Sequence, residues 1–318
     1  MLTIGYKASA EQFGPRDLLA YAIHAQRVGF DSIFVSDHFQ PWRYTDGHAP
    51  NALVWLGAAM SRTERATIGT SVLTPSFRYH PAIVAQAFAT LAMLDQNRRV
   101  VLGVGTGESL NEAALGIEWP DQKERFARLK EATELIHELW TRDFVTFEGQ
   151  FYKTENATIY DRPEKPVELW IAASGPAAAR LAGRVADGFI CTSGKGMELY
   201  TETLLPAVAE GAEKAGRSVE GIEKMIEMKV SYDLDRKRAL QDCGIWSALA
   251  LPSEAKMGVD DPREMERLAA ELPLEQAATR WLVSNDPDEQ VEQIRPYVEA
   301  AAAMRRLTAS SSDTSTST

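Results

Sequence analysis

Short apolar runs alternate with amphipathic stretches along most of this chain. The apolar runs predict strands at residues 3–6, 32–36, 67–71, 100–103, 168–172, 188–191 and 224–230. The stretches between them predict helices at residues 15–28, 50–62, 81–94, 122–140, 176–184 and 201–215. Because strands and helices alternate, we expect parallel strands joined by right-handed crossovers. Seven such strands favour a TIM-type (β/α)8 barrel over a Rossmann sheet.

Three segments depart from this alternation. Residues 144–166 predict a hairpin-like excursion, and residues 231–273 predict a long, mostly helical insertion after the seventh strand. We therefore expect one barrel domain over residues 1–304 with two insertions. A helical pattern runs from Pro287 to about Met304, and the Ser- and Thr-rich residues 305–318 are expected to be disordered. No eighth strand is recognisable after the last helix.

Composition narrows the classes of partner and compartment. The formal net charge of -11 argues against nucleic acid as the main partner. No apolar stretch reaches the roughly 18 residues that could span a membrane, and the start lacks a signal-peptide layout. Two cysteines, Cys191 and Cys243, cannot form a disulfide framework, so we expect a cytoplasmic protein. Cys191 fits a buried strand residue better than a nucleophile.

Reactive side chains follow the second predicted strand at once. Asp37, His38 and Trp42 come directly after it, and Glu11 follows the first strand. The carboxyl ends of parallel strands carry the chemistry of α/β barrels. A lone histidine is nevertheless often structural, and Asp37 could simply cap the turn. The five histidines lack the spacing of a metal site, and no G-x-S-x-G nucleophile motif is present.

Three later strand ends carry glycine-rich or small-residue loops. The loop at 103–112 contains three glycines, Glu108 and Asn111, which suits either a ligand or a tight strand-to-helix turn. It does not match the dinucleotide fingerprint G-x-G-x-x-G. The loop at 172–178 opens a helix at Pro176 and leaves N–H groups for an anion. Lys195, between two glycines, suits either a phosphate or solvent. So many polar strand ends indicate an enzyme.

Several separate segments together resemble the F420-dependent glucose-6-phosphate dehydrogenases of the luciferase-like barrel superfamily. The similarity covers about residues 2–298 and rests on the segments at 5–13, 36–43, 69–75, 103–108, 191–196 and 280–283. It implies oxidation of glucose 6-phosphate at C1 to 6-phosphogluconolactone. The hydride would pass to C5 of coenzyme F420, an 8-hydroxy-5-deazaflavin. A homodimer is common in the family.

The resemblance also implies roles for individual residues. His38 and Glu108 match the acid/base pair, Trp42 an aromatic residue beside the reacting carbon, and Glu11 a nearby carboxylate. Positions that match deazaflavin contacts are Asp37, Thr74, Thr106, Gly107, Asn111, Ser174, Gly175, Ala177 and Ala178. Positions that match sugar-phosphate contacts are Thr192, Lys195, Lys256 and Arg280. Ser71-Val72 matches a non-proline cis peptide of the relatives. On this basis His38 would accept the hydroxyl proton, and Glu108 would manage the proton at N1 of the ring.

Two departures from the family pattern keep other functions open. Ser174 stands where relatives commonly have glycine, and the likeness stops after about residue 299. The alternatives are an FMN- or F420-dependent luciferase-like oxidoreductase with another substrate, or an inactive barrel with an altered C-terminus. A Schiff-base aldolase would need a lysine within a strand, whereas Lys195 lies beyond one.

Overall fold

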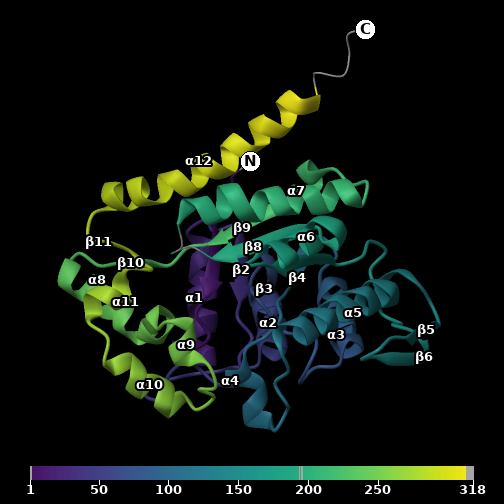
Figure 1. Cartoon of the computed structure of the whole chain (residues 1–318), viewed down its shortest axis with the longest axis horizontal. Helices are drawn as coiled ribbons and strands as arrows, with labels where there is room; N and C mark the ends of the chain where they lie inside the picture. The colour runs from purple at the N-terminus through teal and green to yellow at the C-terminus, as the bar shows by residue number, and fades with distance from the viewer. Residues whose placement is uncertain (1, 193, 195, 313–318) are drawn as a thin grey trace. The chain divides into compact units, whose positions relative to one another are not determined.

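The computed structural model describes residues 2–192, 194 and 196–312. The chain divides into two compact units (Figure 1). Unit 1 consists of Met1–Ala172 and Lys256–Glu266, and unit 2 consists of Ala173–Ala255 and Arg267–Thr318. The expectation of one domain over residues 1–304 stays a prediction, and each unit is described by itself.

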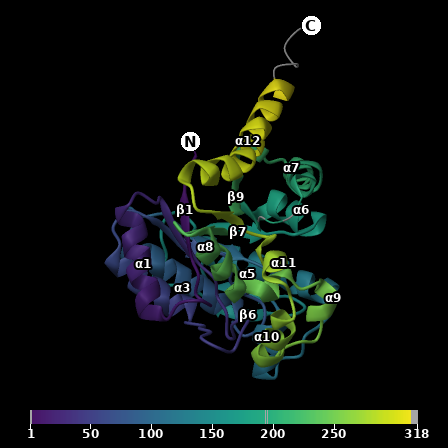
Figure 2. The ribbon, with the colours of Figure 1, turned by 90° about the vertical axis from the view of Figure 1, so that its left-hand side faces the viewer.

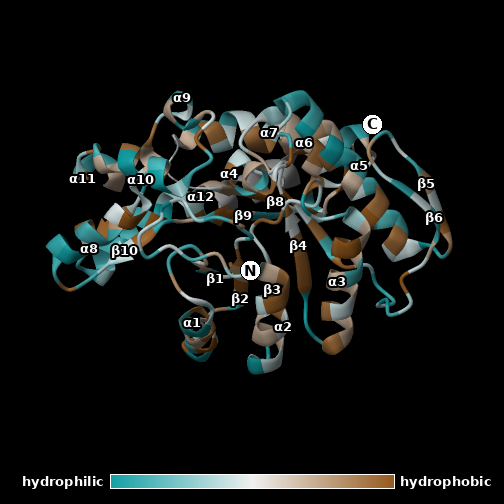
Figure 3. Cartoon of the chain, turned by 90° about the horizontal axis from the view of Figure 1, so that it is seen from below, coloured by the Kyte–Doolittle hydropathy of each residue, from teal (hydrophilic) through white to brown (hydrophobic). Residues whose placement is uncertain are grey.

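Unit 1 contains five parallel strands in the order β1-β2-β3-β4-β7. Their bounds are Gly5–Ala8, Ser32–Val35, Thr67–Thr70, Val100–Val104 and Glu168–Ala172, which confirms five of the predicted strands. Ile33, Phe34 and Val35 in β2 are at most 4% exposed. Figure 3 shows β4 mostly in the brown of apolar residues. Strands so completely apolar are buried on both faces, as in parallel sheets.

Four helices of unit 1 begin within two residues of their predicted starts, and the short helical segments at 109–115 were not predicted. The helices are α1 (Pro15–Arg27), α2 (Ala52–Arg62), α3 (Pro81–Leu94), α4 (Ser109–Glu112), the short 3-10 turn η1 (Ala113–Leu115) and α5 (Gln122–Thr141). Proline opens α1 and α3, and the side chains of Asn51 and Asp121 accept backbone N–H bonds at the starts of α2 and α5. In Figure 3, α1, α2 and α3 lie along one side of β1–β4.

A hairpin extends unit 1 after α5, as predicted. Strands β5 (Val145–Glu148) and β6 (Lys153–Ala157) pair antiparallel. The carboxylate of Glu131, on α5, accepts N–H bonds of 2.9, 2.7 and 2.7 Å from the turn residues Gln150, Phe151 and Tyr152. One half-buried carboxylate thus holds the turn of the hairpin to the helix.

Unit 2 begins with two further predicted strands and two closely packed helices. Strands β8 (Gly188–Thr192) and β9 (Glu223–Glu227) pair parallel. Helix α6 (Pro176–Val185) lies beside α7 (Leu205–Lys214), which continues the π-helical turn η2 (Leu199–Leu204) and precedes the 3-10 turn η3 (Val219–Gly221) (Figures 1 and 2). A Cβ on Gly183 would lie 2.1 Å from the Val208 carbonyl oxygen, so only glycine permits this close helix contact.

The remainder of unit 2 is mostly helical and includes two short strands that the sequence did not predict. Strands β10 (Val230–Tyr232) and β11 (Leu282–Ser284) pair parallel in a separate sheet. The helices are α8 (Arg236–Asp242), the 3-10 segment η4 (Cys243–Ala250), α11 (Leu274–Ala278) and α12 (Pro287–Ser312). Helices α9 (Ser253–Lys256) and α10 (Pro262–Ala270) contain residues of both units.

Three boundaries differ from the sequence prediction. The seventh strand ends at Glu227 rather than at residue 230, because its partner β8 ends at the paired Thr192. The first residues of the predicted insertion belong to β10, although the rest is helical as predicted. Helix α12 continues past Met304 to Ser312, and residues 313–318 of the predicted tail lie outside the described residues. No strand follows α12 in the described part.

Among the helices that the structure describes, none combines the length and apolar character needed to cross a bilayer.

Candidate active site

His38 follows β2, and its two ring nitrogens have different partners. Nε2 lies 2.9 Å from Glu11 Oε1, and the other carboxylate oxygen accepts a 2.8 Å hydrogen bond from the Ser36 hydroxyl. Nδ1 lies 3.3 Å from the Asn111 amide nitrogen and 3.9 Å from Glu108 Oε2. The His38 and Glu11 side chains are only 12% and 8% exposed. Residues predicted from three strand ends thus meet at one buried imidazole.

The charges around this imidazole favour a proton on it. Burial alone lowers the pKa of His38, but Glu11, Glu108 and Asp37 outweigh burial and raise it. Burial alone raises the pKa of Glu11, but His38 and Lys7 outweigh it and hold that pKa below its usual value. The carboxylate of Glu11 is therefore a fixed negative charge beside Nε2.

The pKa of Glu108 is raised, whereas that of Glu11 is lowered. Burial raises the pKa of its carboxyl, Glu11 adds to the rise, and His38 and Lys256 oppose it. Its Oε2 is buried without a hydrogen-bond partner in the part of the chain that the structure describes, although the whole side chain is 44% exposed. A buried polar atom without a partner costs free energy, so a ligand group that bonds to Oε2 would be favoured.

A buried ion-pair network lies next to His38 and joins the loop after β2 to α4. Arg78 Nη2 donates to Asp37 Oδ2 at 2.5 Å and to the Asp37 carbonyl at 2.9 Å, while Nη1 binds the Glu112 carboxylate. The Asp37 and Glu112 side chains are 1% and 0% exposed. The Tyr79 hydroxyl donates to Asp37 Oδ1 at 3.3 Å. The carboxylate of Asp37, predicted to contact the deazaflavin, is therefore already bound by protein groups.

The backbone after β3 and β4 forms a surface suited to a flat ring. The peptide bond between Ser71 and Val72 is cis, as the resemblance implied, and Lys7 Nζ donates to the Ser71 carbonyl. Gly107 has a φ of 84°, and a Cβ there would lie 2.9 Å from the Thr74 methyl carbon. Only glycine allows this approach. Together with the unpartnered Glu108 oxygen, these features fit a polar ring such as the deazaflavin.

Trp42 and Lys256 form a cation–π pair in unit 1. The Lys256 ammonium lies 5.6 Å from the centre of the Trp42 ring, which is 6.4 Å from the His38 ring. Lys256 was predicted as a phosphate contact. The structure places its charge beside Trp42 and close enough to Glu108 to affect the pKa of that carboxyl.

The other predicted phosphate residues belong to unit 2. Thr192 ends β8, and its hydroxyl accepts a 2.5 Å hydrogen bond from Lys229 Nζ. Gly194 packs on Arg280, since a Cβ on Gly194 would lie 3.0 Å from the Arg280 Cβ. Lys195 lies outside the described residues. Unit 2 thus brings the Thr192 hydroxyl and Lys229 together, and places Gly194 against Arg280.

The remaining predicted cofactor residues lie at the start of α6. Gly175 is the N-cap residue in an extended conformation, and no side chain caps the helix. Ser174 and Ala177 are exposed, and Gly175 and Ala178 are half-buried. The uncapped N–H groups and the positive end of the helix dipole suit an anionic group.

Three residues that the sequence did not single out belong to these arrangements. Arg78 binds Asp37, Ser36 binds Glu11, and Lys229 binds Thr192. Only Ser36 lay within a segment already noted as reactive. Arg78 and Lys229 each lie 37 or more positions from their partners, so local spacing carried no signal for them.

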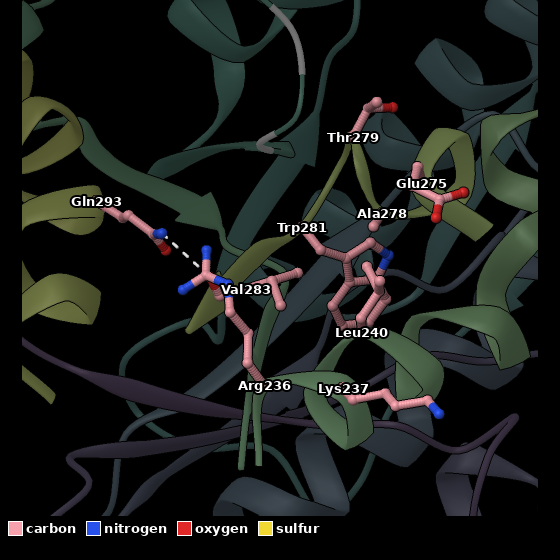
Figure 4. A pocket seen from close by; sticks show the side chains of 9 residues that line it. All are labelled: Arg236, Lys237, Leu240, Glu275, Ala278, Thr279, Trp281, Val283 and Gln293. Carbon is pink, nitrogen blue, oxygen red and sulfur yellow. Dashed lines mark hydrogen bonds between the residues drawn. The ribbon is translucent and has the colours of Figure 1, made fainter. Parts of the chain in front are cut away.

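A separate pocket of about 550 Å³ in unit 2 holds none of the predicted site residues. Its lining includes Trp281, Leu240, Val283 and the charged side chains of Arg236 and Lys237 (Figure 4). Arg236 is paired with Glu289 at 2.8 Å. This pocket is therefore not the candidate active site.

Comparison with known proteins points to one group of enzymes. Residues 2–304 match the model of the luciferase-like monooxygenase family. The F420-dependent glucose-6-phosphate dehydrogenase of Beutenbergia cavernae is 66% identical over 299 residues, with 94% of this chain and 89% of the relative covered. The protein of the same name from Nakamurella multipartita is 63% identical over 298 residues, covering 94% and 88%.

Solved structures of F420-dependent enzymes are also similar to this chain. An F420-dependent secondary alcohol dehydrogenase in complex with an F420-acetone adduct has a TM-score of 0.89 and 34% identity, covering 94% of this chain and 90% of that one. A coenzyme F420-dependent tetrahydromethanopterin reductase from Methanopyrus kandleri has a TM-score of 0.75 at 20% identity and shows the fold alone. The predicted TIM-type barrel class is confirmed by these matches.

Proposed function

Because this chain belongs to the F420-dependent glucose-6-phosphate dehydrogenases, within the luciferase-like monooxygenase family, we propose that it oxidises glucose 6-phosphate at C1. The product is 6-phosphogluconolactone, and coenzyme F420 is the hydride acceptor. The observation that carries the proposal is His38, held by Glu11 at 2.9 Å, with the unpartnered Glu108 oxygen 3.9 Å from its other nitrogen.

His38 is the proposed base. Oxidation of C1–OH to C1=O removes a proton from oxygen and a hydride from carbon. Nε2 is bound by Glu11, so the proton goes to Nδ1. The negative charge of Glu11 stabilises the imidazolium that results, as a carboxylate does behind a catalytic histidine. A deazaflavin bound beside His38 would supply the carbon, C5, that accepts the hydride.

Glu108 is the proposed proton donor. Its raised pKa lets the carboxyl hold a proton nearer to neutral pH than an ordinary glutamic acid does. The sugar hydroxyl gives its proton to His38. The proton on Glu108 Oε2 would go to N1 of the ring and neutralise the negative charge that the hydride brings. Trp42, with Lys256 on its ring, supplies a rigid aromatic wall beside His38.

Residues of unit 2 are proposed to bind the 6-phosphate. Thr192 supplies a hydroxyl, Arg280 and Lys195 supply charge, and Lys229 adds a cation at the Thr192 hydroxyl. Binding energy at a group far from the reacting carbon can orient that carbon. Gly175 and the start of α6 are proposed to bind the anionic tail of the cofactor.

The direct test is reduction of F420 by a panel of sugars, followed by its absorbance. We expect turnover with glucose 6-phosphate and at least tenfold lower kcat/KM with free glucose, because the phosphate contacts are lost. FMN with oxygen serves as the control for a luciferase-like monooxygenase. Flavin turnover without F420 reduction, or no reduction with any hexose phosphate by the folded chain, would contradict the proposal.

Lys229→Met tests the phosphate site. We expect KM for glucose 6-phosphate to rise roughly 10- to 100-fold, the cost of one hydrogen bond to a charged group, while the F420 dissociation constant stays unchanged. Lys224→Met is the matched control, because Lys224 donates to the Val219 and Ile222 carbonyls instead. Equal losses for glucose and glucose 6-phosphate would remove Lys229 from the phosphate site.

A cytoplasmic homodimer is also proposed. Within the described residues, Cys191 and Cys243 are both buried free thiols, which suits a reducing compartment. Sedimentation of the purified chain at several concentrations tests the dimer, and a single monomer boundary throughout would contradict it.

A further inference from the structure

The side-chain amide of Asn111 has only one orientation that satisfies its neighbours. Its Oδ1 accepts backbone N–H bonds from Phe39 at 2.8 Å and from Gln40 at 3.2 Å. A rotated amide would set its NH2 group against these two donors. Oxygen therefore faces the loop, and the NH2 group faces His38 Nδ1 at 3.3 Å.

This orientation determines which nitrogen of His38 carries the proton. A donor faces Nδ1, so Nδ1 must present its lone pair. On the other side, Glu11 Oε1 lies 2.9 Å from Nε2, and a carboxylate only accepts, so Nε2 carries the hydrogen. Both contacts are satisfied by the neutral Nε2–H tautomer alone. In the imidazolium, Nδ1–H would point at the Asn111 donor.

We propose that Asn111 is a positioning residue of the reaction: its amide selects the Nε2–H tautomer of His38 and keeps the Nδ1 lone pair ready for the sugar hydroxyl proton. The inference rests on the proposed dehydrogenase function and adds the residue that makes His38 a usable base. The 3.3 Å contact is long, so the O–H of the substrate can replace it with a shorter bond.

The charges around the imidazole act against the effect of the Asn111 amide. Three carboxylates favour protonation of His38. They are Glu11 in the loop after β1, Asp37 directly before His38, and Glu108 at the start of α4. The cations that act on Glu11 or Glu108 are Lys7 and Lys256, and Trp42 adds an uncharged ring. The pKa of His38 is raised to about 9 even with Asn111 in place, so a donor at Nδ1 is needed to limit how tightly the acids make His38 hold its proton. The Asn111 amide supplies that donor.

The test is Asn111→Asp, read by nitrogen NMR of the imidazoles in the ligand-free protein. Aspartate keeps an oxygen for the Phe39 and Gln40 amides and presents an acceptor to Nδ1. We expect wild-type His38 to show an unprotonated Nδ1 at pH values above its raised pKa of about 9, and the variant to bind a proton there at least tenfold more tightly, about one pH unit. In the assay, the acid limb of kcat/KM should move to higher pH by the same amount. His38→Gln identifies the His38 signals.

Asn97→Asp is the matched control, because it makes the same chemical change at an exposed residue of unit 1 that precedes β4, at the end of the strand away from Glu108. It should leave the His38 titration unchanged. Asn111→Ala, which removes the donor without adding charge, should also raise the proton affinity of Nδ1. Identical tautomers and titrations in the wild type and both Asn111 variants would overturn the proposal. The NMR measurement needs neither sugar nor cofactor, so it can succeed or fail separately from the dehydrogenase assay.

Discussion

Replacing His38 with alanine is expected to lower turnover by roughly 10²- to 10⁴-fold, the usual contribution of a general base. The proton of the sugar hydroxyl would have no acceptor, since Glu11 is bound to Ser36 and Glu108 holds its proton more tightly than usual. The measurement is kcat for F420 reduction at saturating glucose 6-phosphate. The F420 dissociation constant, followed by fluorescence, should change little.

His38→Gln separates the loss of the base from damage to the site. The glutamine amide can still donate to Glu11, so this carboxylate keeps a partner, yet an amide does not accept a proton at neutral pH. We expect this variant to lose as much turnover as His38→Ala while unfolding at nearly the wild-type temperature. Turnover within threefold of the wild type in either variant would remove His38 from the chemistry.

Replacing Arg78 with methionine is expected to destabilise the protein by about 3–5 kcal/mol, because removing one partner of a buried ion pair leaves uncompensated charge. Asp37 and Glu112 would remain as two almost fully buried carboxylates beside His38. Urea unfolding of the full chain measures the effect. We expect the destabilisation to decrease as pH falls, since the orphaned carboxylates can then be protonated.

Two further variants test whether the orphaned charges cause the loss of stability in Arg78→Met. Adding Glu112→Gln to Arg78→Met removes one of the orphaned charges, so part of the stability should return. Lys130→Met breaks an exposed i,i+4 pair with Glu134 and should leave the unfolding midpoint unchanged. An Arg78→Met protein as stable as the wild type would mean that the network contributes nothing to folding.

The proposed function rests on the likeness to the dehydrogenases and on the His38 cluster, not on the last residues of the chain. The likeness to the dehydrogenases covers 94% of the chain, and the His38 cluster lies wholly within unit 1. The described residues contain no strand after α12. The two short strands β10 and β11 pair with one another.

The sequence by itself determined most of the strands and helices and indicated where the candidate site lies. Seven predicted strands and the hairpin are present, because apolar runs, proline and capping residues act over a few positions. The end of β2 could be recognised as reactive because parallel strands direct their carboxyl ends to one edge. The resemblance then linked His38 to Glu108 and Glu11.

Only the tertiary structure decided how these side chains work together. Asn111 lies 73 positions from His38, Arg78 lies 41 from Asp37, and Lys229 lies 37 from Thr192. Such contacts depend on strand register and on loop conformation, which no local pattern encodes. The run from Ile33 to Trp42 identified a histidine. The tautomer of that histidine is determined by an amide from another loop, whose own orientation depends on two backbone N–H groups.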